Sequence, residues 1–242
     1  MRRSGWERVA ASVVLAVLLP AVPATADPHP SYPSTVFRTV VADHFDRSSG
    51  PLGVAATGQT WRRINDLWSV TTAHRAAAHV TPVSRFGYAV VNTRVSKNYV
   101  VGADVTLSPT PLRAAPGIVA NFVDRKNYLF AKVEVTVAHP YSFLALGDQR
   151  AGVVHSTLCR DSHLGMVNGG TYRLSLRRKG YTAIAVVATM TGQRLGSCSV
   201  VLSPTQRAAY GSGTRFGLRV KIVSDEDDGR SRWDNFLVRA AA

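Results

Sequence analysis

Aromatic and charged side chains alternate along residues 127–137. Tyr128, Phe130, Lys132 and Glu134 take every second position of this segment, and apolar side chains stand between them. Because a β-strand points successive side chains to opposite faces, these four share one face. Sugars stack their C–H faces on aromatic rings and pair their hydroxyls with charged groups, so this face is a candidate for glycan binding. A strand whose outer side is covered by a loop has the same pattern.

Glu134 could also act as a general acid or base if a second carboxylate lay nearby. Asp104 would be that partner if its strand, residues 97–107, lay beside the strand of Glu134. No spacing in the sequence supports this pairing. The interpretation that we favour is that Glu134 neutralises Lys132 or an arginine on a neighbouring strand.

A second candidate surface consists of basic side chains at alternate positions of two later segments. Its members are Arg173, Arg177, Arg215, Arg219 and Lys221. If the segments 170–178 and 213–223 belong to one sheet, these side chains form a single basic face. Guanidinium forks bind carboxylate and phosphate groups, which suits uronic-acid polymers, sulfated glycans or teichoic acids. An ordinary solvated face is the alternative.

Strands are the elements that must position these residues. Runs rich in β-branched and aromatic residues recur about every ten residues from Val36 onward, with Gly, Pro, Asn and Asp between them and no long segment of helical period. This pattern predicts an all-β fold of two antiparallel sheets. One short helical turn is expected, from Ser203 as N-cap through Tyr210, because Gln206 stands three residues after Ser203.

The N-terminus is typical of a secretory signal. Arginines at positions 2, 3 and 8 precede an apolar run over residues 9–19 and the small-residue ending Ala24-Thr25-Ala26. The run is too short to cross a membrane, which needs about 20 apolar residues. We therefore predict a signal peptide over residues 1–26, an extended lead-in over 27–35, a single domain over 36–242, and a secreted, extracellular protein without a membrane span.

The chain is strongly basic. It has 29 Lys and Arg against 15 Asp and Glu, a net charge of +14. Removal of residues 1–26 leaves 26 basic and 14 acidic side chains, or +12. Such a field attracts anionic polymers in general. No run of five like charges and no recognisable nucleic-acid motif is present, so we expect no nucleic-acid partner. We expect the partner to be a glycan or an anionic cell-wall polymer. We also expect the protein to be a monomer.

The two cysteines, Cys159 and Cys198, are expected to form a disulfide, because an exported chain meets oxidising conditions. Two buried free thiols are the alternative.

Several short motifs resemble one known fold family. In chain order they are Asp43-His44-Phe45-Asp46-Arg47, Gly58-Gln59-Thr60-Trp61, Leu67-Trp68-Ser69-Val70, Gly170-Thr171-Tyr172-Arg173-Leu174, Gly213-Thr214-Arg215-Phe216-Gly217-Leu218 and Trp233-Asp234-Asn235-Phe236-Leu237-Val238. Their order over residues 41–238 is similar to that of bacterial concanavalin A-like lectin/glucanase, or laminin G-like, domains. The resemblance implies a jelly-roll sandwich and leaves the substrate open, since that fold hosts lectins, glycosidases, lyases and adhesion modules.

The resemblance does not extend to catalytic signatures. Glucanases of this fold carry a Glu-x-Asp-x-x-Glu type motif, and after residue 26 this chain has only two glutamates, Glu134 and Glu226. We therefore favour a protein that binds a carbohydrate or cell-surface polymer without evident catalytic residues. The alternative is a secreted glycoside hydrolase or polysaccharide lyase that uses Glu134.

Calcium is the one ion that we consider. Resembling domains often hold a structural calcium between their first and last strands, which here implies Asp43 and Asp234 as ligands. The acidic segment 224–229 offers crowded oxygen ligands as well, although its spacing is not that of an EF-hand. A solvated hairpin tip that pairs with Arg230 and Arg232 explains that segment equally well. No other cofactor is expected.

Overall fold

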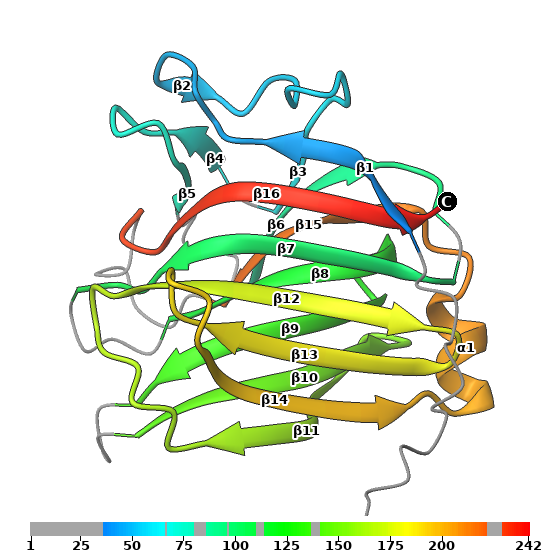
Figure 1. The fold of residues 1–242 in the computed structure, drawn as a ribbon. Coiled ribbons are helices and arrows are strands. Elements are labelled where there is room, and N and C mark those ends of the chain that lie inside the picture. Colours follow the sequence, from blue (N-terminus) through cyan, green and yellow to red (C-terminus); the bar gives the residue numbers. More distant parts are fainter. Residues whose placement is uncertain are drawn as a thin grey trace, which may run out of the picture. The chain divides into compact units, whose positions relative to one another are not determined.

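Two antiparallel sheets pack face to face (Figure 1). The computed structural model describes residues 36–65, 67–79, 86–95, 97–109, 114–136, 141–221 and 229–242. The predicted signal peptide, the lead-in and the carboxylates of the acidic segment lie outside the described residues. Among the described residues, no helix has the length and apolar character needed to cross a membrane.

In the described part of the chain, one sheet has nine strands, in the order β14-β13-β12-β7-β16-β5-β4-β2, with β1 paired to β16. Its strands are β1 (Phe37–Asp43), β2 (Gly50–Pro51), β4 (Leu67–Val70), β5 (Ala76–His79), β7 (Tyr99–Thr106), β12 (Thr171–Lys179), β13 (Thr182–Ala188), β14 (Arg194–Val201) and β16 (Arg232–Ala241).

The other sheet has seven strands among the described residues, in the order β11-β10-β9-β8-β15-β6-β3. Its strands are β3 (Arg62–Ile64), β6 (Phe86–Asn92), β8 (Ala115–Asp124), β9 (Asn127–Val135), β10 (Ser142–Arg150), β11 (Val153–Ser162) and β15 (Arg215–Lys221). The prediction of a two-sheet antiparallel sandwich is confirmed.

The core lies between the sheets and follows the alternation in the sequence. The apolar positions of β9, β12 and β15 are all buried there: Leu129, Ala131, Val133, Tyr172, Leu174, Leu176, Phe216, Leu218 and Val220. Each of these strands contributes one face to the core, as the period of two predicts. The side chains at the intervening positions therefore lie on the outer faces of the sheets.

The one helix among the described elements, α1 (Pro204–Tyr210), has the predicted cap. The Ser203 hydroxyl accepts a hydrogen bond from the Gln206 backbone N–H, and the Ser203 N–H donates to the Gln206 side chain at 2.8 Å. This capping box satisfies two donors that a helix start otherwise leaves unpaired.

The disulfide joins the two sheets. Cys159 is on β11 and Cys198 on β14, the strands that end their respective sheets, and the Cα atoms are 5.8 Å apart. Figure 1 shows these two strands next to each other at the bottom of the view. The predicted pairing is confirmed.

Aromatic residues from motifs far apart in the sequence meet at the other end of the sandwich. The Trp61 ring lies 5.1 Å from Phe236 and 5.7 Å from Phe45, and Trp68 lies 5.0 Å from Trp233. These contacts tie β4, the loop after β1 and the loop before β3 to β16. They fix the position of β16, which carries part of the candidate site.

Candidate functional site

The predicted aromatic binding face is closed by its own packing. Tyr128 and Phe130 have 0% exposed surface. They belong to a second apolar cluster on the outer side of the seven-stranded sheet, made by Tyr88, Val90, Val119, Phe122, Tyr128 and Phe130. The Tyr128 hydroxyl hydrogen bonds to that of Tyr88 at 2.7 Å, and burial raises the pKa of Tyr88. The prediction that these rings stack on a glycan is wrong, because no ring surface remains free.

Lys132 and Glu134 pair with each other beside this cluster. Lys132 Nζ lies 3.0 Å from Glu134 Oε2 and 5.1 Å from the centre of the Phe143 ring. Burial lowers the pKa of Lys132, and the Glu134 carboxylate opposes that shift. Asp104 is on β7, in the other sheet, so the carboxylate pair required for catalysis does not form. The structure therefore agrees with the favoured role of Glu134, which was to neutralise Lys132.

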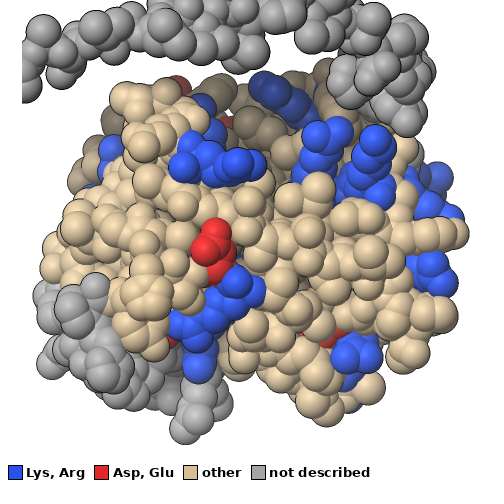
Figure 2. All heavy atoms as spheres, turned by 60° about the horizontal axis from the view of Figure 1, so that its bottom comes forward, with Lys and Arg blue, Asp and Glu red and all other residues tan. Residues whose placement is uncertain are grey.

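The predicted single basic face is wrong because its two strands belong to different sheets. Arg173 and Arg177 are exposed on β12, in the nine-stranded sheet. Arg215, Arg219 and Lys221 are on β15, in the seven-stranded sheet. Arg219 is only 2% exposed, and its guanidinium lies 4.2 Å from the centre of the Phe130 ring. Figure 2 shows cations spread over the molecular surface, with few acidic side chains among them.

A groove of about 610 Å³ on the outer face of the nine-stranded sheet contains two predicted residues, Arg173 and Arg177. We call it the arginine groove. Strands β1, β7, β12 and β16 line it, together with His44. Its charged lining residues are Arg173, Arg177, Arg239 and Asp104, and its apolar ones include Phe37, Val100 and Leu237.

Strand register explains the shape of the arginine groove. Val100 of β7 is paired to Arg177 on one side and to Arg239 on the other, so two cations flank it. Two residues along β7, Gly102 is paired to Ser175 and Leu237. Because Gly102 has no side chain, the sheet surface is low at this position. Gly102 therefore forms the floor of the groove between the long side chains of β12 and β16.

A hydrogen-bond network holds Arg173 at the rim of the groove. Asp104 is 2% exposed, accepts a hydrogen bond from Arg173 Nε at 3.0 Å, and accepts another from Asn235 Nδ2 at 2.8 Å. Asn235 Oδ1 in turn lies 2.6 Å from His44 Nδ1. The hydrogen bond and charge of Asp104 raise the pKa of Arg173. Arg173 therefore stays a cation, with its side chain 54% exposed to a ligand.

Asn235 reaches Asp104 because β16 is irregular there. Its φ of 48° is in the left-handed region, and the pairing of β16 with β7 shifts between Asp234 and Leu237. Asparagine tolerates this conformation better than most residues. Asn235, Arg239 and Phe37 were not predicted from the sequence as site residues. Only the presence of Asn235 in the closing motif was a signal, and no spacing placed it beside Asp104.

The arrangement suits a ligand that has both negative charge and apolar surface. Three guanidinium groups and one carboxylate leave the described lining with a net charge of +2. The Arg177 guanidinium lies over the Phe37 ring, 5.4 Å from its centre, so a cation and an aromatic side chain are in contact in the groove. Forked guanidinium donors bind carboxylate or sulfate oxygens, while rings and aliphatic side chains pack on C–H groups.

The Asp43 carboxylate, which was predicted as a calcium ligand, has several hydrogen-bond donors around it. It accepts hydrogen bonds from both Nη atoms of Arg47, at 2.8 and 2.7 Å, and from Trp61 Nε1 at 2.6 Å. Both oxygens of Asp43 thus pair with protein donors in the structure, and calcium at Asp43 stays a prediction. Within the described residues, no group of three or more His, Cys, Asp or Glu side chains could hold a metal ion. Calcium at Asp234 stays a prediction.

Similarity to solved structures identifies the fold. A winged bean acidic lectin complexed with methyl-α-D-galactose aligns with a TM-score of 0.54 and 9% identity, over 85% of this chain and 99% of the lectin. A Bacillus licheniformis β-glucanase aligns with a TM-score of 0.51 and 11% identity, over 83% of this chain and 97% of the enzyme. The fold is concanavalin A-like.

A protein of unknown function from Shewanella oneidensis has the same architecture, with a TM-score of 0.57 and 12% identity, over 86% of this chain and 87% of its own. No protein-family model matches the sequence. No curated protein matches it either. At these identities the concanavalin A-like fold is what the comparisons establish, and function has to be argued from the site.

Proposed function

We propose that this protein is a secreted binder of an anionic polysaccharide, which it holds in the arginine groove. The observation that carries the proposal is the placement of Arg173, Arg177 and Arg239 around a floor made by Gly102. Asp104 keeps Arg173 oriented, so part of the binding geometry exists before a ligand arrives. Such preorganisation lowers the entropic cost of binding.

An acidic sugar polymer fits the groove better than a small anion does. The cations stand on β12 and β16, on both sides of β7, so they can contact successive charged units of a chain. Phe37 and Leu237 offer apolar surface for the C–H faces of sugar rings. The net charge of +12 after residue 26 adds long-range attraction for such a polymer. Lectins and a glucanase share the concanavalin A-like fold, which supports a carbohydrate as the ligand.

Export supports a ligand outside the cell. The predicted signal peptide ends at Ala26, and the Cys159–Cys198 disulfide is of the kind that persists in oxidising compartments.

Cleavage of the polymer by Glu134 is the alternative function. The shared fold with a β-glucanase keeps it under consideration. Against it, Glu134 is paired with Lys132, and Asp104 is on the opposite sheet and engaged with Arg173 and Asn235. We therefore expect binding without new chain ends.

Retention on immobilised polygalacturonate tests the proposal, with neutral pullulan as the comparison. The wild type should be retained on polygalacturonate and released as salt screens the arginines, and it should pass through pullulan. The double variant Arg177→Gln/Arg239→Gln should be retained at least ten-fold more weakly, since hydrogen bonds to charged groups contribute most to such sites. Arg38→Gln/Arg63→Gln, which also removes two exposed charges but on β1 and β3 outside the groove, is the matched control.

Two outcomes would contradict the proposal. One is equal weakening by Arg38→Gln/Arg63→Gln and by Arg177→Gln/Arg239→Gln, which would show that only net charge matters. The other is release of reducing ends or unsaturated products that stops in Glu134→Gln, which would establish the enzyme instead.

A further inference from the structure

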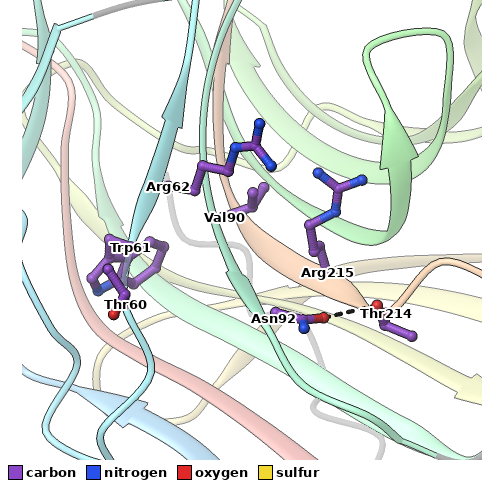
Figure 3. A pocket seen from close by; sticks show the side chains of 7 residues that line it. All are labelled: Thr60, Trp61, Arg62, Val90, Asn92, Thr214 and Arg215. Carbon is purple, nitrogen blue, oxygen red and sulfur yellow. Dashed lines mark hydrogen bonds between the residues drawn. The ribbon is translucent and has the colours of Figure 1, made fainter.

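The structure contains a second hollow, on the outer face of the seven-stranded sheet (Figure 3). It has a volume of about 570 Å³ and lies where β3, β6 and β15 run side by side. Its lining residues are Thr60, Trp61, Arg62, Val90, Asn92, Thr214 and Arg215. It shares no residue with the arginine groove, so it is a separate feature that the proposed function does not use.

Two guanidinium groups meet in this pocket without a carboxylate between them. Arg62 is paired to Val90, and Arg215 is paired to Asn92, so β6 separates the two arginines. Figure 3 shows the Arg62 guanidinium extending over Val90 toward the side of Arg215, whose guanidinium rises beside it. Neither arginine forms an ion pair with a carboxylate of the described residues.

The two charges disfavour each other in the unliganded protein. Burial and the charge of Arg62 lower the pKa of Arg215, and the charge of Asp124 opposes that shift only in part. Arg215 is held in place all the same, because one of its Nη atoms donates to the Val123 carbonyl and its guanidinium lies 5.3 Å from the centre of the Phe122 ring. An anion between Arg62 and Arg215 would remove the repulsion without moving either side chain far.

Neutral donors complete the pocket. The Thr214 hydroxyl donates to Asn92 Oδ1 at 2.8 Å, which leaves Asn92 Nδ2 as a donor at the pocket floor. Thr60 adds a hydroxyl group at the wall, and Trp61 adds an aromatic surface. Two cationic forks with amide and hydroxyl donors match a group that has three or more acceptor oxygens, whereas one fork is enough for a carboxylate.

We propose that this pocket binds a tetrahedral oxyanion, the phosphate or sulfate group of an esterified ligand. The volume exceeds that of the anion alone and leaves room for the unit that carries the ester, next to Trp61. Arg62 supplies an exposed cation and Arg215 a fixed one, so the anion bridges β3 and β15.

Calorimetric titration with inorganic phosphate and with sulfate tests the proposal. The titrations use the Arg177→Gln/Arg239→Gln variant, which removes two of the three cations of the arginine groove and leaves Arg173, which is paired with Asp104. We expect saturable binding of both anions, weakened ten-fold or more by the further change Arg62→Gln. Arg63→Gln, an equal charge change at the next residue of β3 that does not line the pocket, should leave the affinity within two-fold.

Glucose 6-phosphate and glucose 6-sulfate distinguish an ester from the free ion. Tighter binding of an ester than of its free ion supports an esterified ligand, and equal or weaker binding of both esters would overturn that part of the proposal. Absence of saturable binding by any of the four probes, or equal weakening by Arg62→Gln and Arg63→Gln, would overturn the site. Because Arg215 also anchors β15 to β8, Arg215→Lys serves as the second variant, with thermal unfolding as the check on its fold.

The experiments distinguish a failure of the oxyanion pocket from a failure of the proposed function. Polygalacturonate retention should be unchanged in Arg62→Gln, and loss of phosphate binding should not follow from the groove variants.

Discussion

The charged residues of this protein divide into those that face a ligand and those that serve the fold. Arg173, Arg177 and Arg239 keep their donors at the surface of a groove. Lys132 and Arg219 are nearly buried: Arg219 lies over Phe130 of the aromatic cluster, and Lys132 lies over the Phe143 ring beside it. Residue type alone does not separate these groups, because arginine and lysine carry long apolar stems that cover rings as readily as they reach solvent.

The Lys132–Glu134 pair should be structural, and a double-mutant cycle tests this role. Lys132→Met and Glu134→Gln should each destabilise the fold by about 1–3 kcal/mol, since each leaves a largely buried partner unpaired. The double variant should cost less than the sum of the two. Chemical denaturation measures all four proteins. Additive losses would contradict a direct interaction.

The Lys132–Glu134 pair also predicts that the stability of the folded protein depends on pH. The pKa of Lys132 is lower in the folded protein than its ordinary value of 10.5, so the unfolded chain binds the proton more tightly between those two values. Stability should therefore rise with pH through this interval, relative to the Lys132→Met protein. A difference in stability between wild type and Lys132→Met that is constant up to pH 10.5 would contradict it.

The alternation of residues within a strand could be predicted from the sequence, whereas the pairing between strands could not. The alternation in β9, β12 and β15 correctly assigned core and outer faces. It did not reveal that the outer face of β9 carries a second apolar layer, because an outer aromatic residue looks the same whether it is covered or free. The sheet to which a strand belongs could not be predicted from a local pattern either. The residues of β12 and β15 alternate in the same way, yet strand pairing puts the two strands in different sheets. The bulge that turns Asn235 toward Asp104 depends on that pairing as well.

The disulfide should stabilise the end of the sandwich where β11 and β14 lie. It closes a loop with a sequence separation of 39 residues. By loop entropy, its removal in Cys159→Ser/Cys198→Ser should cost about 3–4 kcal/mol. Urea denaturation measures the loss, and reductant should lower the stability of the wild type but not that of the variant. Peptide mapping that recovers two freely alkylated cysteines from the native protein would contradict the bond.

At the scale of the whole molecule, the two outer faces have different characters. The nine-stranded sheet offers an open groove with three arginines, whereas the seven-stranded sheet is largely covered by packed aromatic side chains and has a smaller pocket at one side. A net charge of +12 after residue 26 draws anionic ligands to both. The fold could be predicted from the periodicity of the sequence and the order of its motifs. The arginine groove could not, because it depends on how residues from four strands lie next to one another.

Export is the prediction that concerns the whole chain. Because Ala24-Thr25-Ala26 has the small residues that signal cleavage requires, the secreted protein should begin at Asp27. N-terminal sequencing and the intact mass of protein from culture supernatant measure this directly. A chain that keeps Met1 and stays in the cytosol would refute it.

The central claim is that an acidic polysaccharide binds in the arginine groove, and calorimetric titration with a galacturonate oligomer tests it most directly. The wild type should bind, with an affinity that falls as sodium chloride rises from about 50 to 200 mM, because salt screens the exposed arginines. Arg177→Gln should weaken binding about ten-fold and reduce the dependence on salt, while Arg38→Gln should do neither. Binding by Arg177→Gln, Arg239→Gln and wild type with equal affinity and equal salt dependence would contradict the account.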